Sequence, residues 1–207
     1  AYSNSFPVPF LFDDLDAIPE NPTLRGFPEV LSPPVGTTVY GRPVLNVSFA
    51  LNYALSGVRV WSYHAANLLI HLGAGLALYG IVRRTLLSSR LTETFGQAAA
   101  PLAAAAAGLW LVHPVQTESV TYIVQRAEAL VGLFYFLTLY CVIRAAETGA
   151  GQKLWPVLAV VCCALGMGTK EVMATAPFLV LLYDRTFLAG SIAAALRQRR
   201  GLYAGLF

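Results

Sequence analysis

The sequence contains few charged residues. Asp, Glu, Lys and Arg together make up 12% of the 207 residues, against about 25% in an ordinary soluble domain. Hydrophobic residues make up 57% of the chain and the mean hydropathy is +0.60. These values predict a protein with several membrane-spanning segments rather than a soluble core. The formal net charge of +3 is too small and too evenly spread to indicate a nucleic-acid partner.

Cysteines and enzyme motifs are also scarce. The three cysteines, Cys141, Cys162 and Cys163, all lie within apolar runs, and the vicinal pair points to different helix faces. We therefore expect small buried apolar side chains and neither a disulfide nor a metal site. The sequence has no nucleophile triad, no Gly-rich phosphate loop and no CxxC pair, so no template of a soluble enzyme fits it. Without an initiator Met or a signal peptide, and with a last apolar run "GLYAGLF", it is expected to be an internal piece of a longer membrane protein.

Residues 1–61 have no apolar run long enough to cross a bilayer. They are rich in proline, which breaks long helices. We expect an irregular, partly helical loop outside the membrane. Within it, "RPVLNVSFALNYALSG" has apolar residues at helical spacing, which predicts a short amphipathic helix with one apolar stripe: Val44, Val47, Leu51 and Leu55. That helix would lie on the membrane surface or pack against neighbouring membrane helices.

Residues 62–207 carry the apolar segments. Five are expected, at 62–82, 97–112, 127–146, 154–168 and 172–183. The last two are short for a hydrocarbon core of about 30 Å, so they form either two tilted spans meeting near Thr169–Glu171 or one kinked re-entrant pair. Two spans is the preferred interpretation. The predicted fold is all-α, a polytopic transmembrane bundle of about five spans with the start of a sixth.

The basic residues predict an orientation. Nine of the fourteen lie in the loops 83–96, 144–153 and 184–200. The positive-inside rule makes these loops cytoplasmic. The clusters "DDLD", "HPVQTESVTYIVQRAE" and "GTKE" then share the non-cytoplasmic face.

The stretch "HPVQTESVTYIVQRAEAL" is the richest in polar side chains near a predicted bilayer boundary. If 117–128 is one helix, Glu118, Tyr122 and Gln125 follow one another at three-to-four-residue steps, with Arg126 or Glu128 beyond them. Charges here are costly unless they are paired or functional. The alternative is a solvated connecting helix in which Arg126 extends to the interface.

Two further groups are candidates. Lys170 and Glu171 form either a simple interfacial pair at a turn or a cationic site for an anionic head group such as a phosphate. His64, Asn67 and His71 share one stripe of the first span, where interhelical hydrogen bonding is the alternative to function. The two histidines do not have the spacing of a helical zinc motif, so we expect no metal there.

Taken together, the motifs resemble those of one known family. "FDDLDAIPENP", "RPVLNVSFALNYALSG", "YHAANLLIHL", "HPVQTESVTYIVQRAEAL", "GMGTKEVMATAP" and "LLYDR" occur in the order of the membrane region of the TMTC (transmembrane and tetratricopeptide repeat-containing) proteins, here as a bacterial relative. The resemblance extends from about Phe12 to Arg185. It implies a GT-C class glycosyltransferase that transfers a sugar, mannose in the animal members, from a polyprenyl- or dolichyl-phosphate carrier to protein Ser or Thr hydroxyls. The tetratricopeptide repeats of the family would follow this segment, which itself shows no 34-residue repeat.

The resemblance also implies roles for residues. By position, Asp13 or Asp14 accepts the proton of the attacking hydroxyl, with Asp14 preferred. Arg126 and Lys170, as cations facing outside, stabilise the departing lipid phosphate. The second-rank candidates for binding the sugar or orienting those cations are Glu118, Gln125, Glu128, Glu171, His64, Asn67 and His71. Arg42 would shape the loop or contact a head group.

The expected partners are a lipid-linked sugar donor, a protein acceptor and membrane lipids. No cofactor or metal is required, although Asp13 and Asp14 could supply part of a divalent-ion shell. The protein would reside in a bacterial inner membrane, or in the endoplasmic reticulum membrane of a eukaryote, with its site on the periplasmic or lumenal face.

Two alternative functions are a secondary transporter and an inactive membrane anchor for a repeat domain. Transporter sites usually lie at the membrane midplane, whereas these polar residues gather at one face.

Overall fold

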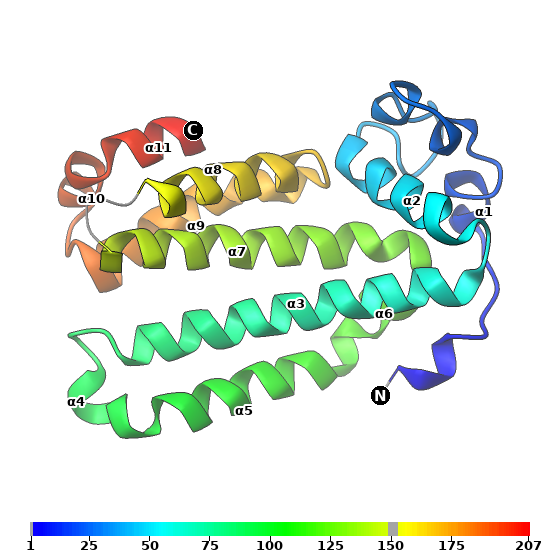
Figure 1. Cartoon of the computed structure of the whole chain (residues 1–207). Coiled ribbons are helices and arrows are strands. Elements are labelled where there is room, and N and C mark those ends of the chain that lie inside the picture. The colour runs from blue at the N-terminus through cyan, green and yellow to red at the C-terminus, as the bar shows by residue number, and fades with distance from the viewer. Residues whose placement is uncertain (1, 149–152) are drawn as a thin grey trace.

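The computed structural model describes residues 2–148 and 153–207, and within these ranges the chain is all-α with no strand. Long helices lie side by side, and successive long helices along the chain run in opposite directions (Figure 1). The prediction of an all-α helix bundle is confirmed.

Three helices are long and apolar enough to cross a membrane. They are α3 (Val60–Leu86), a helix over Thr92–Val112 and a helix over Ile123–Glu147. The second comprises α4 (Thr92–Phe95), a 3-10 turn (Gly96–Ala98) and α5 (Ala99–Val112). The third consists of the 3-10 turn η6 (Ile123–Gln125) and α7 (Arg126–Thr148). The expected segments 62–82, 97–112 and 127–146 lie within these helices.

The last two expected segments form separate, shorter helices that cover α7. α8 (Leu154–Met167) has 14 residues and a length of about 21 Å, below the thickness of a hydrocarbon core. The 3-10 turn η7 (Glu171–Thr175), α9 (Ala176–Tyr183) and a π-helical turn (Asp184–Leu188) form one further helix. It bends by 102° into α10 (Ile192–Gln198). Counted as one span, this bent pair raises the number of candidate spans in the described residues to four. The five-span topology stays a prediction.

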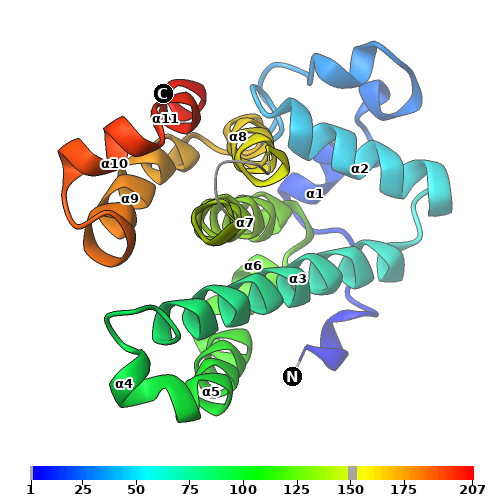
Figure 2. The same cartoon turned by 60° about the vertical axis from the view of Figure 1, so that its left-hand side comes forward.

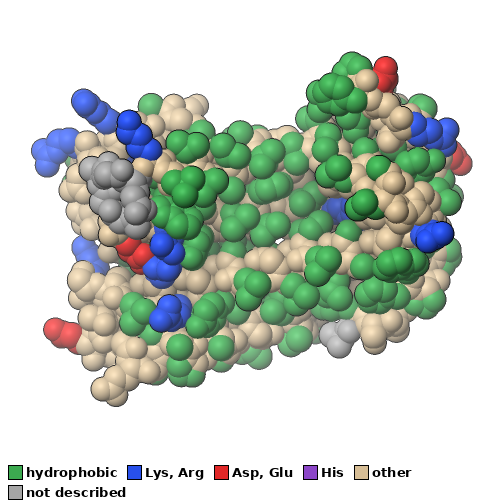
Figure 3. All heavy atoms as spheres, in the orientation of Figure 1, with side chains coloured by type: hydrophobic (Ala, Val, Ile, Leu, Met, Phe, Trp, Pro, Cys, Tyr) green, Lys and Arg blue, Asp and Glu red, His purple; other side chains and the backbone are tan. Residues whose placement is uncertain are grey.

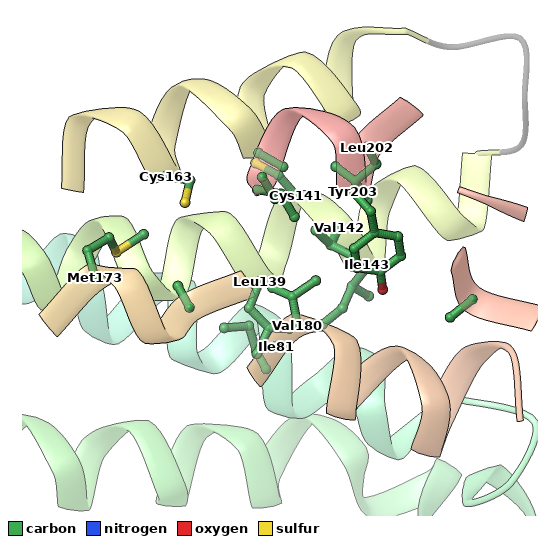
Figure 4. Close-up of a cluster of buried hydrophobic side chains, with 14 of the residues drawn as sticks. Ile81, Leu139, Cys141, Val142, Ile143, Cys163, Met173, Val180, Leu202 and Tyr203 are labelled. Carbon is green, nitrogen blue, oxygen red and sulfur yellow. The ribbon is translucent and has the colours of Figure 1, made fainter. Parts of the chain in front are cut away.

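Helix α7 is the centre of the bundle. It packs against α3 on one side and against α8 on the other, and Figure 2 shows α9 beside it as well. Figure 4 shows the apolar side chains of this contact, with Cys141 and Cys163 among them and α11 (Arg200–Leu206) closing the cluster. Both thiols are free and buried, as the apolar interpretation of the cysteines predicts for them, while Cys162 is half-buried.

The charged residues lie at the two ends of the bundle. Figure 3 shows Lys, Arg, Asp and Glu at both ends and hydrophobic side chains along the length between them. We call the end with residues 13–59, 113–126 and 168–171 the acidic end, and the end with residues 83–96, 144–148 and 184–200 the basic end. An apolar length between two charged ends is typical of a membrane-spanning bundle.

A loop region with short helices covers the acidic end. It contains the 3-10 turns Ser3–Ser5, Pro22–Arg25 and Glu29–Leu31, together with α1 (Asp13–Ala17) and α2 (Pro43–Ser56). A second apolar cluster joins it to the bundle. Its buried members include Ile18, Leu45, Phe49, Tyr63 and Ile123.

The predicted helix at 42–57 exists, and its predicted apolar stripe is half-buried at one end and exposed at the other. α2 begins with Pro43 at its first position and ends at Gly57, whose φ of 60° is left-handed. Its buried face carries Leu45, Asn46, Phe49 and Asn52. Val44 and Val47 of the expected apolar stripe are half-buried, whereas Leu51 and Leu55 are 63% and 88% exposed, because the opposite face of α2 meets α3 and α7.

Candidate functional site

Asp14 is a buried anchor between the loop region and the bundle. It is 1% exposed, and its two carboxylate oxygens accept hydrogen bonds from different backbone N–H groups. Oδ1 accepts from Val124 at 2.8 Å and Oδ2 accepts from Leu11 at 3.0 Å. Burial raises the pKa of Asp14, opposed by these two hydrogen bonds. The carboxylate therefore fixes the first turn of α1 against the turn that opens α7.

Asp13 lies beside Asp14 but is exposed. Its backbone N–H points to the hydroxyl of Tyr122, and burial raises the pKa of that phenol, with the charges of Asp13, Asp14 and Glu118 acting in the same direction. Tyr122 and Glu118 thus lie close in space to Asp13 and Asp14, although about a hundred residues separate the two pairs in the chain.

A cavity of about 370 Å³ opens at this point. We call it the acidic-end hollow. Its polar lining includes Asp14, His64, Glu118 and Tyr122, and its apolar lining includes Leu11 and Phe12. The structure therefore brings the predicted Asp14, His64 and Glu118 to one site. Nε2 of His64 bonds the carbonyl of Val8 at 3.1 Å, while its Nδ1 is buried and no described residue bonds it.

Arg126 is 1% exposed, so its side chain is enclosed and does not extend to the membrane interface as the alternative interpretation expected. Its Nε donates to Asn67 Oδ1 at 2.6 Å, and its Nη atoms donate to Asn52 Oδ1 and to the carbonyls of Ser48 and Tyr63 at 2.9–3.1 Å. The guanidinium also lies 4.6 Å from the ring centroid of Phe49, a cation–π contact. Because α2, α3 and α7 each supply part of this network, the charge is enclosed where the three helices meet.

The three polar side chains of the α3 stripe have different partners. Asn67 accepts from Arg126 and donates from Nδ2 to the carbonyl of Ile123 at 3.2 Å, so it has an interhelical role. His71 bonds the carbonyl of Leu111 at 2.9 Å through Nε2 and stacks on Trp110 at 4.8 Å between ring centroids. Of the three predicted side chains, only His64 reaches the acidic-end hollow.

Lys170 is half-buried and forms an ion pair with Glu128. Glu128 lines a second cavity of about 280 Å³, together with His71, Trp110, Gln116 and Ser119. We call this cavity the Glu128 hollow. It lies on the other side of α6 (Thr117–Thr121), because Glu118 and Ser119 are neighbours in that helix and line different hollows. The predicted Lys170, Glu128 and His71 therefore gather at a separate place from Asp14.

The remaining predicted residues make local contacts. Arg42 forms an ion pair with Glu171 at 3.5 Å and donates to the Thr38 carbonyl at 3.2 Å, so it ties the loop region to η7. Gln125 donates from Nε2 to Glu118 at 3.2 Å. A continuous helix over 117–128 is wrong: α6 ends at Thr121 and Tyr122 is extended. This break turns Tyr122 toward Asp13.

Residues that the sequence did not single out complete the two hollows and the Arg126 network. Asn52, Tyr63 and Trp110 are the main ones. Their signal in the sequence is weak, since each sits in an apolar helix where a packing role is the ordinary expectation. Within residues 2–148 and 153–207, no group of three or more His, Cys, Asp or Glu is placed to hold a metal ion.

Fold and site together define a helix bundle of membrane-protein type with a pair of acids, an enclosed guanidinium and a Lys–Glu pair at one end. Sequence comparison finds proteins that are similar to this chain. The chain is 30% identical over 198 residues to the human "Protein O-mannosyl-transferase TMTC2", which covers 88% of the chain and 22% of that protein. It is 30% identical over 204 residues to mouse TMTC1 and 30% over 209 residues to human TMTC4, both with the same "Protein O-mannosyl-transferase" name.

These similarities support the TMTC family for most of the chain. The chain spans 20–27% of the length of the three relatives named, so it is similar to one part of them. No family model matches the sequence. No solved structure matches it either.

Proposed function

We propose that this chain is part of the membrane region of a TMTC-family protein O-mannosyltransferase, a GT-C class enzyme. The reaction is transfer of a mannose-like sugar from a polyprenyl- or dolichyl-phosphate carrier to a Ser or Thr hydroxyl of a protein. The relatives named as O-mannosyl-transferases support the reaction class. The observation that carries the site is the Asp13–Asp14 pair, which is fixed at the rim of the acidic-end hollow by two hydrogen bonds to Asp14.

Within that pair we assign the proton transfer to Asp13. Both oxygens of Asp14 already accept backbone N–H groups, and the side chain is buried. Asp13 is exposed, next to the hollow, and its backbone is held against the hydroxyl of Tyr122. In the proposed step the acceptor oxygen forms a bond to the anomeric carbon, its proton passes to the Asp13 carboxylate, and the carrier phosphate leaves with the electrons of the broken C–O bond. Asp14 positions Asp13 and takes no proton.

The departing phosphate needs a cation or a donor. We assign this role to Lys170, which is half-buried at the acidic end and pairs with one carboxylate, Glu128. Because Glu128 lines the hollow on the other side of α6 from Asp14, the role requires a donor that extends from one hollow to the other. Arg126 does not fit it, because the guanidinium is enclosed by its five neighbours. We assign Arg126 to holding α2, α3 and α7 in place around the site.

We propose the membrane orientation that the sequence predicts, and a reaction that needs no metal. Since the basic end carries eight of the fourteen basic residues, we place it in the cytoplasm and the acidic end in the periplasm or lumen. Of the two adjacent carboxylates, Asp14 has its oxygens occupied by N–H donors, which leaves Asp13 alone as a ligand of full capacity. One carboxylate is a small part of a hard-ion shell.

The test is a transfer assay on the full-length parent protein with a labelled lipid-phosphate mannose and an acceptor peptide. Asp13→Asn should lower transfer by about 100-fold or more, the ordinary contribution of a positioned base, with unchanged thermal unfolding. Asp14→Asn should lower both transfer and the unfolding temperature. Asp16→Asn is the matched control: it removes the same charge from the same helix at an exposed position, and it should leave both readouts unchanged.

Two outcomes would contradict the proposal. Wild-type transfer by Asp13→Asn at matched expression would remove Asp13 from the chemistry. Absence of transfer from any polyprenyl-phosphate sugar by the wild type would reject the reaction class and favour a membrane anchor.

A further inference from the structure

The basic end of the bundle contains a third cavity, of about 300 Å³. It lies between the end of α3 with residues 87–89, the end of α7, and the π-helical turn Asp184–Leu188. We infer that this cavity binds the head group of an anionic glycerophospholipid, with the phosphate on its arginine side and an acyl chain on its apolar side. The inference rests on no part of the transfer chemistry at the opposite end.

The arginine side carries an excess of positive charge. Arg84 forms an ion pair with Glu147, and Arg144 Nε lies 3.7 Å from the same carboxylate. Arg199 donates from one Nη to both oxygens of Asp184, at 2.7 and 2.9 Å. Three guanidinium groups thus face two carboxylates, so Glu147, which also lines the cavity, is shared between two cations. The charged residues that line the cavity itself are Arg84, Arg199 and Glu147, so an arriving phosphate meets two cations and one carboxylate.

Two donors on this side lack protein partners. The hydroxyl oxygen of Ser88 is buried in the cavity lining and no described residue bonds it. Arg90 is exposed and forms no hydrogen bond or ion pair with a described residue. One of its Nη atoms lies 3.4 Å from the point where a Cβ would stand on Gly190. Arg90 therefore reaches from the 87–89 side of the cavity to the segment that follows Leu188.

The opposite side of the cavity is apolar. Leu87, Phe187 and Leu188 line it, and Leu87 is 42% exposed. Phe187 and Leu188 belong to the π-helical turn, whose wider spacing occurs mostly at functional positions in helices. Asp184, fully buried in the same turn, holds the turn to Arg199 and to the hydroxyl of Tyr203 at 2.8 Å. The apolar wall is thus fixed beside the cations.

This combination indicates a lipid rather than a free phosphate. A free phosphate needs donors on all sides and gains nothing from Leu87 or Phe187, whereas a lipid phosphate arrives with an acyl chain attached. Basic pockets between membrane helices on the cytoplasmic side are common sites for anionic head groups. The basic end adjoins the apolar length of the bundle (Figure 3), and the positive-inside rule places this end on the cytoplasmic side.

The experiment measures lipid retention by native mass spectrometry of the full chain, purified in detergent and titrated with phosphatidylglycerol or with phosphatidylcholine. The wild type should retain one phosphatidylglycerol at concentrations where it retains no phosphatidylcholine. Arg90→Gln should weaken this retention about fivefold, as expected for the loss of one arginine near a phosphate. Ser88→Ala should weaken it in the same direction, and neither change removes an internal hydrogen bond, so the fold should persist.

Arg185→Gln is the matched control. Neither arginine is among the residues that line the cavity, but Arg90 directly follows the lining residues 87–89 and reaches the segment after Leu188. Arg185 is exposed at the same end, and its loss should change retention by less than about twofold if binding is local. An equal loss in Arg185→Gln and Arg90→Gln would show diffuse surface attraction and overturn the inference. Competition by glycerol phosphate at the concentration of the lipid would overturn the lipid assignment, and equal retention of both lipids would overturn the charge assignment.

Discussion

Nε of Arg126 donates a 2.6 Å hydrogen bond to Oδ1 of Asn67. This bond joins the first residue of α7 to the third turn of α3, and both residues are buried. The guanidinium has only neutral partners among the residues that the structure describes, and it is held by hydrogen bonds and aromatic faces. Such a charge is stable only while every partner is present.

Loss of a single partner should therefore be costly. Asn67→Ala leaves the Nε–H of Arg126 unpaired and removes one of the hydrogen bonds to the carbonyl of Ile123, and we expect a loss of about 2–3 kcal/mol in the free energy of unfolding. The measurement is thermal unfolding in detergent. Asn4→Ala, the same chemical change at an exposed position, serves as the control and should be neutral. A wild-type unfolding temperature for Asn67→Ala would show that the network does not hold the helices.

Asp14 should make stability depend on pH. Burial raises the pKa of its folded carboxyl, so the folded state binds the proton more tightly than the unfolded chain does. The resulting stabilisation is fully present below the unfolded pKa of about 4 and is lost as the pH rises through the folded value. Acidification from about pH 7 to about pH 5 should therefore stabilise the wild type relative to Asp14→Asn, which cannot titrate.

Unfolding temperatures at these two pH values provide the measurement. Asp16→Asn keeps Asp14 and should show the wild-type pH dependence. If Asp14→Asn also kept it, Asp14 would not be the responsible group.

Two helical glycines should respond in opposite ways to Ala. A Cβ on Gly75 would stand 2.6–2.8 Å from three side-chain atoms of Leu111, where α3 meets α5. Gly75→Ala should cost about 1–3 kcal/mol through overpacking. Gly108, within α5, has open space at the Cβ position, and Gly108→Ala should gain up to about 1 kcal/mol of helix propensity. Thermal unfolding of the two variants compares them directly, and equal effects would rule out close packing of α3 and α5.

Lys170 should act on the donor. If it meets the carrier phosphate, Lys170→Gln should raise the apparent KM for the lipid-linked sugar and lower kcat, since charge develops on the phosphate as it leaves. We expect a fall of about tenfold or more in kcat/KM. Arg59→Gln removes an exposed cation of the same end as the control, and Lys170→Arg should recover part of the activity. A Lys170→Gln enzyme with unchanged kcat/KM would restrict Lys170 to its pair with Glu128.

The structure divides the predicted site residues into two groups. Asp14, His64 and Glu118 line one hollow, and Lys170 pairs with Glu128 in a separate cluster; both groups flank the ends of helices whose apolar lengths are plain in the sequence. The sequence did not show that Arg126 is buried. Spacing places an arginine next to a helix end, but it cannot show that α2 crosses above that end and encloses the side chain with Phe49 and Asn52.

The sequence by itself determined the helical, membrane-type character of this protein and the separation of basic from acidic ends, since both follow from local composition: long apolar runs and the loops between them. Only the tertiary structure decided which polar residues meet. The hydrogen bond from Val124 to Asp14 joins residues 110 positions apart, and each of the two hollows at the acidic end is lined by segments that are distant in the chain. Contacts over such separations arise from the packing of helix faces against one another, which the period of a single helix does not encode.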